Sequence, residues 1–361
     1  MVTSTAAWVP SGIDDVTPEW LTGVLRADDS LPHSLCVNAI HPERIAEDSG
    51  FASLLYRVRL SGSPGLPRTV IVKLPGTPEA RGAMEMLGGY RREVEFYRRV
   101  AGRAPMGTPH VHVARMVDGT TDFVLVMEDL QGWENADHLA GLSMDRALIA
   151  IGELAALHGW SMNPANAIPP GAFPGVDTPT VRDVFFPVFG LAWPIYLEHT
   201  TEIVPASVAR FAQRFTEYAP QALEVLSRRS MLLHGDIRAD NMFFSGSTMK
   251  VVDFQFTSVG AGACDIAYLV SQGLPAEVRA GHDEALVREY LTRLAGHGVT
   301  DYSFDEAWRD YRLATAYLIV LPVITLMGWD SLPERSRKLC LKLTERAVAT
   351  IEEIDALGAF E

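Results

Sequence analysis

Residues 232–244, which read LLHGDIRADNMFF, decide the fold of this chain together with the segment VVDFQ at 251–255. The first segment holds Asp236 and Asn241 in the spacing H-x-D-x-x-x-x-N, and Asp253 follows Asn241 by twelve residues. An isolated His-Gly-Asp can be an ordinary turn in which the aspartate caps a neighbouring backbone group. Here three polar positions recur at fixed spacing between apolar runs, so we interpret the segment as a functional loop.

Short apolar runs frame this loop. Residues 231–233 lead into it, and residues 242–244 and 249–252 follow it. Between the last two runs the chain reads SGST, at positions 245–248, which is typical of a hairpin connection. The pattern predicts a strand before the loop and, after it, a hairpin with a four-residue connection.

The three polar side chains are those that phosphoryl transfer requires. In this reaction one carboxylate orients the attacking hydroxyl, and oxygen ligands hold magnesium on the phosphates. We predict that Asp236 is the catalytic base and that Asn241 and Asp253 are the magnesium ligands. Protein kinases have the same spacing, with an arginine where this chain has Gly235.

At these residues the chain resembles the aminoglycoside phosphotransferase and choline kinase superfamily, which phosphorylates small molecules. It looks most like the ecdysteroid kinase-like branch, because of DFQ at 253–255, CDIAYL at 264–269 and TPEWL at 17–21. The resemblance covers roughly residues 13–345. It implies an α+β, protein-kinase-like fold of two lobes. ATP, Mg²⁺ and a small-molecule hydroxyl acceptor are the implied cofactors and partner.

The same resemblance implies where the two lobes lie along the chain. Residues 1–129 are expected to form a nucleotide-binding lobe with an antiparallel sheet and a helix. Residues 130–361 are expected to form a larger, mainly helical lobe with the catalytic loop, the metal site and the acceptor-binding helices.

Arg238 departs from that branch, which commonly carries tryptophan two residues after the catalytic aspartate. An arginine here could reach a phosphate or an acidic acceptor. It could equally be a solvated side chain on a loop near Asp240.

An ATP-binding lobe needs a lysine on a buried strand and a glutamate on the next helix. The β-branched run TVIVKL at 69–74 lies between prolines and places Lys73 like the lysine of a V-A-I-K strand. Apolar side chains at 90, 94, 97 and 100 then form a helical stripe. Glu93 lies beside the stripe, and the resemblance implies that it pairs with Lys73. Glu95 is the second candidate, and a solvated glutamate is the alternative for either.

The phosphate-binding loop is expected between the first two strands. The segment IAEDSGFAS at 45–53 precedes an alternating run at 54–60, and Ser49, Gly50 and backbone amides up to Ser53 could contact phosphate. A hairpin turn would look the same, because one glycine is a weak signal. The sequence contains no G-x-x-x-x-G-K-[ST] motif, which disfavours a P-loop kinase.

The linker between the lobes is expected at the end of the apolar run FVLVMEDL at 123–130. By resemblance, the backbone carbonyl of Glu128 and the backbone amide of Leu130 bind adenine. A plain transition from strand to loop explains these residue types equally well.

The chain beyond residue 130 reads as mainly helical. ALIAIGELAALH at 147–158 predicts an apolar helix, with His158 as a packed or capping residue rather than a catalytic one. Asp265 resembles the structural aspartate that braces the catalytic loop from below, and a helix N-cap is its plainer interpretation.

An aromatic cluster follows a proline-rich loop, in the region where the superfamily inserts acceptor-binding helices. It could line a pocket for a bulky apolar alcohol, or it could belong to the core. Its members are Phe185, Phe186, Phe189, Trp193 and Tyr196.

Composition agrees with a two-lobe enzyme. The 361 residues, 48% of them hydrophobic, can bury a sizeable core. The net charge of −14 argues against a nucleic-acid partner, since binding a phosphate backbone needs clustered lysine and arginine. The acidity could favour a cationic acceptor, or simply confer solubility.

The cysteines and the apolar stretches of the sequence indicate in which compartment of the cell the protein is expected. Three widely separated cysteines form no disulfide framework, and residues 1–10 lack the basic and apolar regions of a signal peptide, so we expect a cytoplasmic protein. Residues 313–329 carry no charge but contain Pro322 and are too short for a full bilayer span. We expect them to form a buried helix, with no membrane partner.

Two other classes of function are alternatives. The first is a catalytically idle, nucleotide-binding pseudokinase or scaffold, against which the joint presence of Lys73, Asp236, Asn241 and Asp253 argues. The second, a protein kinase, is disfavoured because residues 260–265 arrive within twelve residues of Asp253, without an activation loop and Ala-Pro-Glu segment. Aminoglycosides, amino alcohols, sugars, steroids and other natural products all remain candidate acceptors.

Overall fold

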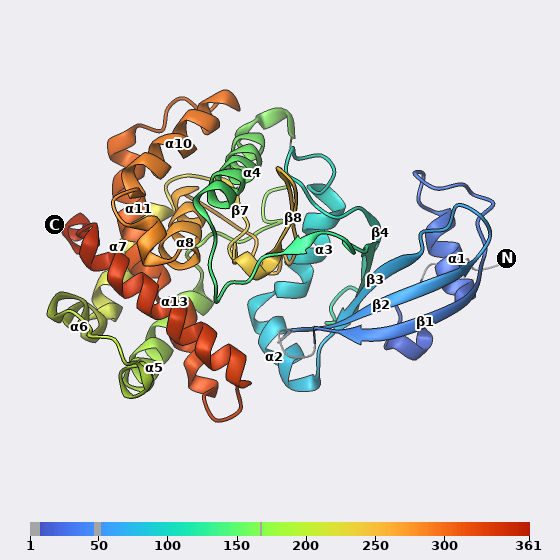
Figure 1. The fold of residues 1–361 in the computed structure, drawn as a ribbon, viewed down its shortest axis with the longest axis horizontal. Helices are drawn as coiled ribbons and strands as arrows, with labels where there is room; N and C mark the ends of the chain where they lie inside the picture. The colour runs from blue at the N-terminus through green and yellow to red at the C-terminus, as the bar shows by residue number, and fades with distance from the viewer. Residues whose placement is uncertain (1–7, 47–51, 167) are drawn as a thin grey trace. The chain divides into compact units, whose positions relative to one another are not determined.

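The computed structural model describes residues 8–46, 52–166 and 168–361. They divide into two compact units (Figure 1). Unit 1 contains the residues up to Arg103 and Thr108–Gly132, and unit 2 contains Ala104–Gly107 and Trp133–Glu361. The chain enters unit 2 for the last time after Gly132. The boundary predicted from the sequence lies close to this point, after residue 129.

Unit 1 is built on a five-stranded antiparallel sheet in the order β1-β2-β3-β5-β4. The strands are β1 (Val37–Ile45), β2 (Ser53–Gly62), β3 (Thr69–Pro75), β4 (Val111–Met116) and β5 (Phe123–Glu128). The helices are α1 (Pro18–Arg26), α2 (Pro78–Leu87) and α3 (Gly89–Arg99), with a short 3₁₀ turn η1 (Ile13–Asp15) before α1.

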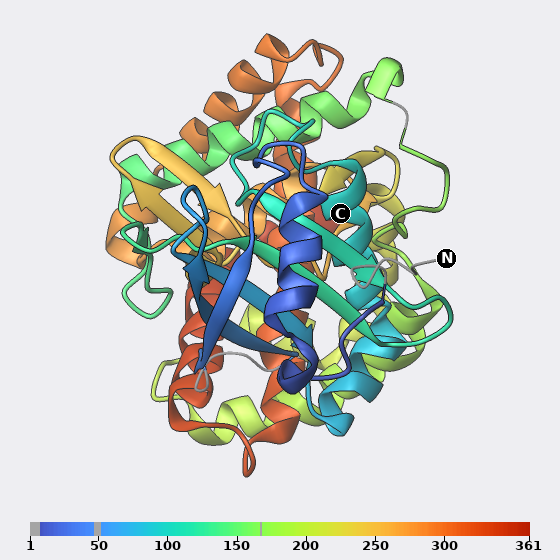
Figure 2. The same cartoon turned by 90° about the vertical axis from the view of Figure 1, so that its right-hand side faces the viewer.

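Helix α1 covers one face of this sheet, as Figure 2 shows in blue. It begins where Thr17 accepts a hydrogen bond from the backbone N–H of Trp20 and Pro18 takes the first helical position. Its apolar side builds the core of unit 1 with the sheet. The buried core residues are Val16, Trp20, Leu21, Val24, Leu25, Val37, Val58, Leu60, Val70, Val72, Leu74, Val113, Val124 and Val126.

The alternation of β3 sorts its side chains between the two faces of the sheet. Val70, Val72 and Leu74 belong to the core under α1. Because successive residues of a strand point to opposite faces, Lys73 points to the other face. There its ammonium meets Glu93 of α3, so the sheet separates an apolar face from a face that carries a buried charge.

Unit 2 is mainly helical. Its helices are α4 (Met144–Met162), α5 (Phe186–His199), α6 (Ala206–Gln213), α7 (Phe215–Leu226), α8 (Ala263–Gly273), α9 (Ala276–Arg279), α10 (Asp283–Gly296), α11 (Phe304–Leu318), α12 (Val320–Thr325) and α13 (Glu334–Glu353). Its short strands are β6 (Glu134–Asn135), β7 (Met231–Leu233), β8 (Met242–Ser245), β9 (Thr248–Val251) and β10 (Ser258–Gly260). The remaining one-turn elements are η2 (Pro164–Asn166), η3 (Val181–Phe185), η4 (Ala239–Asn241), η5 (Leu326–Gly328) and η6 (Ala356–Phe360).

The short strands of unit 2 form two small sheets. β7 pairs with β10, while β8 pairs with both β6 and β9. The β8–β9 hairpin lies where the sequence predicts one, but a four-residue connection is wrong. Ser245 and Thr248 pair within the ladder, so the turn contains only Gly246 and Ser247. Gly246 has φ +59°, a value that tight hairpin turns need and glycine adopts readily.

The aromatic cluster of α5 belongs mainly to the core of unit 2. Phe186, Phe189, Trp193 and Tyr196 are buried, and the ring of Phe189 stacks on that of Phe215 at 3.9 Å between centroids. Of the five predicted residues only Phe185 is partly exposed. The core interpretation therefore explains most of the cluster.

The uncharged stretch near the C-terminus also serves the core. Phe304–Gly328 is the one helical segment of the described chain that is long and apolar enough to cross a membrane, and 61% of its apolar window is buried inside the fold. The stretch consists of α11, α12 and η5 rather than one straight helix. Burial of this kind is typical of a core segment.

Candidate active site

Unit 1 contains a buried ion pair between Lys73 on β3 and Glu93 on α3. The Lys73 Nζ and Glu93 Oε1 atoms lie 2.7 Å apart, and the side chains are 6% and 1% exposed. Glu95, the second candidate, instead pairs with Arg98 and Arg99 on the same helix. A buried charge is tolerated when an opposite charge lies beside it. The sheet and helix thus hold Lys73 Nζ at a fixed place beside the Glu93 carboxylate.

The predicted phosphate-binding loop is described only at its end. Ser49 and Gly50 lie outside the described residues. Ser53 is buried and begins β2, where it is opposite Pro75 at the end of β3. Its contact with phosphate stays a prediction.

The predicted adenine-binding segment begins at the end of β5. The backbone N–H of Glu128 donates to the carbonyl of His110 at 2.8 Å, and the Glu128 carboxylate accepts from the backbone N–H of His110 at 3.0 Å. The next residue, Asp129, accepts from Arg57 at 2.8 Å, and Leu130 is buried. These contacts fix the segment within unit 1, while adenine binding by Glu128 and Leu130 stays a prediction.

In unit 2, Asp265 on α8 supports the loop between β7 and β8. Its carboxylate accepts from the backbone N–H groups of His234 at 2.7 Å and Gly235 at 2.9 Å. This is the bracing contact that the resemblance implies. The plainer N-cap interpretation is wrong, because the N-cap of α8 is Gly262 and Asp265 is the third residue of the helix.

A buried histidine supports Asp265 in turn. His158 Nε2 lies 3.2 Å from Asp265 Oδ2, and His158 Nδ1 lies 3.0 Å from the Tyr290 hydroxyl. Burial alone would raise the pKa of Asp265, but the hydrogen bond from His158 and the N–H groups of the loop hold this pKa below its ordinary value. His158 therefore has the packed, structural role predicted for it.

Gly235 has a steric reason to be glycine. Its φ is +80°, and a Cβ at this position would lie 2.2 Å from the backbone oxygen of Phe256. A side chain does not fit between the loop and residue 256. The Gly in HGD is therefore required by the path of the backbone.

Three side chains surround the carboxylate of Asp236. Arg238 Nε donates to Oδ1 at 2.9 Å, and the Tyr268 hydroxyl lies 3.4 Å from the same oxygen. Asn241 Nδ2 lies 3.3 Å from Oδ2 and 2.9 Å from the Asp236 carbonyl. Arg238 is only 20% exposed, so its interpretation as a solvated side chain near Asp240 is wrong.

The surroundings of Asp236 alter its acidity in opposite directions. Burial raises its pKa above the ordinary value, Arg238 lowers it, and the neighbouring Asp253 raises it. The net direction is upward. A carboxylate of raised pKa is a stronger base than an ordinary aspartate, which suits proton acceptance.

Asn241 and Asp253 are brought together by the β8–β9 hairpin. The backbone N–H of Val252 donates to the carbonyl of Asn241 at 3.0 Å, and His234 Nε2 lies 3.1 Å from the Val252 carbonyl. Asp253 then adopts φ +68°, which is uncommon for a residue other than glycine and recurs at functional sites.

The donor set of these two residues fits magnesium. The amide nitrogen of Asn241 is bonded inside the loop, which leaves its amide oxygen to ligate a cation. Together with the Asp253 carboxylate it offers the all-oxygen ligands that magnesium prefers.

Two residues that contact this loop are absent from the sequence-based site. His138 Nδ1 accepts from the backbone N–H of Ala239 at 2.7 Å, and the backbone N–H of His138 donates to Asp240 Oδ1 at 3.0 Å. These partners are about a hundred residues apart along the chain, so no local pattern signals them. Tyr268 could have been found from the sequence, because it lies three residues after Asp265 and thus on the same side of α8.

Comparison with known proteins agrees with this architecture. No curated protein sequence matches the chain. A choline kinase from Cryptosporidium parvum Iowa II is 12% identical with a TM-score of 0.60, and the match covers 94% of this chain and 97% of that one. A Plasmodium vivax ethanolamine kinase is 12% identical with a TM-score of 0.52, covering 93% and 89%. The GDP complex of a mutant aminoglycoside 2′-phosphotransferase is 14% identical with a TM-score of 0.55, covering 91% and 96%.

At such low identity these structures establish the fold, and the predicted two-lobe, protein-kinase-like α+β fold is confirmed. The model of one sequence family, described as ecdysteroid kinase-like, matches residues 47–298. That range is more than half of the chain and includes the whole segment from Lys73 to Asp253. The chain therefore belongs to the ecdysteroid kinase-like family.

Proposed function

We propose that this protein is an ATP-dependent phosphotransferase that moves the γ-phosphate to a hydroxyl group of a small molecule. Family membership and the kinase-like fold support a small-molecule kinase. The observation that carries the proposal is the arrangement around Asp236, a buried carboxylate with a raised pKa beside a pair of oxygen ligands.

Asp236 has room for an acceptor hydroxyl. A carboxylate offers about four lone-pair positions, and three donors of the described chain, from Arg238, Tyr268 and Asn241, take up to three of them. In the proposed reaction the remaining position accepts a hydrogen bond from the acceptor hydroxyl. Asp236 orients this oxygen toward the γ-phosphorus and takes its proton as the new P–O bond forms and the bond to ADP breaks.

The other assigned residues bind and neutralise the phosphates. Lys73, held by Glu93, is proposed to bind the α- and β-phosphates. Ser49, Gly50 and Ser53 are proposed to contact phosphate, and the backbone of Glu128 and Leu130 to bind adenine. Magnesium held by Asn241 and Asp253 would supply positive charge against the phosphate oxygens.

A catalytically idle nucleotide-binding protein is the second candidate, and one observation favours it. Arg238 occupies Asp236 Oδ1, one of the two oxygens that could face an acceptor hydroxyl. If Arg238 keeps the acceptor from reaching Asp236, nucleotide binding remains without transfer.

Turnover separates the two candidates, whereas nucleotide binding does not. The test measures magnesium-dependent ADP release from ATP across a panel of choline, ethanolamine, aminoglycosides, sugars and steroids, with wild type and Asp236→Asn side by side. We expect an acceptor-dependent signal that falls about 10²- to 10⁴-fold in Asp236→Asn, the range that a general base contributes. ATP affinity should stay close to that of wild type.

Two results contradict the proposal. Acceptor-dependent turnover that Asp236→Asn leaves unchanged removes Asp236 from the reaction. Tight ATP binding with no turnover for any member of the panel supports the idle protein instead.

A further inference from the structure

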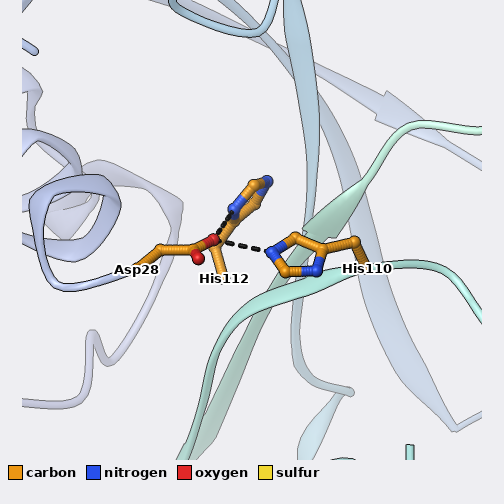
Figure 3. A group of neighbouring side chains, drawn as sticks. All are labelled: Asp28, His110 and His112. Atoms are coloured by element: carbon orange, nitrogen blue, oxygen red, sulfur yellow. Dashed lines mark hydrogen bonds and ion pairs between the residues drawn. The ribbon is translucent and has the colours of Figure 1, made fainter. Parts of the chain in front are cut away.

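Three side chains of unit 1 converge at a place that takes no part in the proposed reaction. Asp28, His110 and His112 point toward one another, as Figure 3 shows. Asp28 Oδ2 lies 2.7 Å from His110 Nε2 and 2.6 Å from His112 Nδ1. One ligand atom from each residue falls within 4.8 Å of the other two.

The fold brings these residues together from distant parts of the chain. His112 lies on β4, an edge strand of the sheet, and His110 directly precedes that strand. The register of β4 against β5 shifts between Val111 and Val113, so His112 lies at an irregularity of the strand, and the ring centroids of His110 and His112 are 4.9 Å apart. Asp28 follows the C-terminus of α1, and the backbone N–H of Ser30 fixes its other oxygen, Oδ1, at 2.9 Å.

We propose that Asp28, His110 and His112 form a binding site for a divalent transition-metal ion, with zinc as the ion of first choice. Two imidazoles and one carboxylate are a common protein ligand set of zinc sites that keep a fourth position open. Imidazole nitrogen favours zinc, copper, iron and nickel over magnesium and calcium, which prefer oxygen. This inference is independent of the proposed function.

The geometry needs only a small adjustment to admit the ion. Tetrahedral zinc with bonds of about 2.0–2.2 Å separates its ligand atoms by about 3.3 Å. The two distances from Asp28 are 2.6 and 2.7 Å, so each imidazole nitrogen must move less than about 1 Å away from the Asp28 oxygen. His110 is 48% exposed, which gives it freedom to move and leaves solvent access for a water as the fourth ligand. Ser30 Oγ, 3.3 Å from His110 Nε2, is a further polar group beside the three residues.

The local charge also favours a cation. The Asp28 side chain is largely buried, and the Glu128 carboxylate accepts a hydrogen bond from the backbone N–H of His110 at 3.0 Å. Two carboxylates near two imidazoles therefore leave a negative charge that a divalent ion would neutralise.

A second explanation is a hydrogen-bonded clamp without metal. In that case both imidazoles donate to Asp28 and hold the segment after α1 against β4. The two explanations differ in whether zinc binds with these three residues as ligands.

The test titrates zinc into the full-length, chelator-treated protein and follows binding by calorimetry. Cobalt titration then reports the ligand geometry through its visible absorption bands. We expect one equivalent of zinc in wild type and an affinity at least about 10-fold weaker in His110→Ala and in His112→Gln, since even changes outside the ligand shell cost 10- to 100-fold. His41→Ala, an exposed histidine on β1, is the matched control and should bind zinc like wild type.

Asp253→Asn separates this site from the proposed magnesium site and should also keep its zinc. The proposal is overturned if wild type binds no zinc, or if His110→Ala and His112→Gln bind it as tightly as wild type. It is also overturned if Asp253→Asn alone removes the zinc. Far-ultraviolet circular dichroism of each variant shows whether a variant that has lost zinc binding is still folded. Because His110 is exposed, His110→Ala is less prone to unfold than His112→Gln.

Discussion

Lys73 in unit 1 and Asp236 in unit 2 are both buried charged groups, but the two units hold them by different means. Lys73 projects from a regular strand and has its ion-pair partner, Glu93, on a regular helix. Asp236 projects from an irregular loop, and its carboxylate meets three different side chains. The loop itself is held through its backbone by Asp265.

The difference teaches how each charge responds to substitution. In unit 1 the position of the charge comes from the sheet and helix, so removal of Glu93 mainly costs stability. In unit 2 several contacts share the task of holding Asp236, so the loss of any single contact costs less stability and changes the acidity or position of the carboxylate instead.

The largest effect on stability is expected at Glu93. Glu93→Gln removes the carboxylate that pairs with buried Lys73, and breaking a buried ion pair in this way costs about 3–5 kcal/mol. Urea denaturation measures the free energy of unfolding. Glu95→Gln is the matched control on the same helix, because Glu95 pairs with the exposed arginines Arg98 and Arg99, and its change in the free energy of unfolding should stay within about 0.5 kcal/mol. Equal losses in both variants would contradict the contrast between a buried and a surface pair.

A smaller loss of stability is expected when the support of the loop that carries Asp236 is weakened. Asp265→Asn replaces one of the two oxygens that accept from His234 and Gly235 by an amide nitrogen. Loss of one hydrogen bond to a charged group costs about 1.5–3 kcal/mol. We expect this destabilisation together with a fall in turnover, because the loop carries Asp236. Normal turnover in a destabilised variant would show that the loop keeps its geometry without this brace.

The same contrast explains which features could be predicted from the sequence. The strand around Lys73 and the stripe at 90, 94, 97 and 100 have clear periodicity, and all four stripe residues are buried. The spacing of Asp236, Asn241 and Asp253 is equally local. A motif of this kind consists of given residue types at a given spacing, and it predicts the local course of the backbone.

Features that depend on distant contacts could not be predicted in this way. His138 contacts Ala239, in the loop that carries Asp236, 101 positions along the chain, and Asp28 contacts His110 and His112 at separations of 82 and 84 positions. The predicted four-residue connection of the β8–β9 hairpin is also wrong, because the pairing of Ser245 with Thr248 depends on the positive φ of Gly246 rather than on composition. Arg238 has a charge that suits either solvent or a buried carboxylate, and only the folded loop decides between them.

The smallest effect is expected when Arg238 is replaced. This substitution alters the acidity of Asp236 but leaves Asp265 and its contacts with the backbone of the loop in place. In the proposed reaction Asp236 acts as a base in its ionised form, so activity should be present above its pKa and be lost as the pH falls through it. Arg238 lowers this pKa, which burial and Asp253 raise. Arg238→Ala should therefore shift the acidic limb of kcat/KM to higher pH.

The variant Arg238→Lys keeps a positive charge at this position and should have an acidic limb close to that of wild type. The comparison of the two variants separates charge from packing, because lysine restores the charge without the guanidinium. If Arg238 instead blocks the acceptor, Arg238→Ala raises turnover at every pH and leaves the limb in place. If the acidic limb of kcat/KM moves in Arg238→Ala but not in Arg238→Lys, the charge of Arg238 sets the pKa of Asp236. If turnover instead rises by the same factor at every pH, Arg238 obstructs the acceptor.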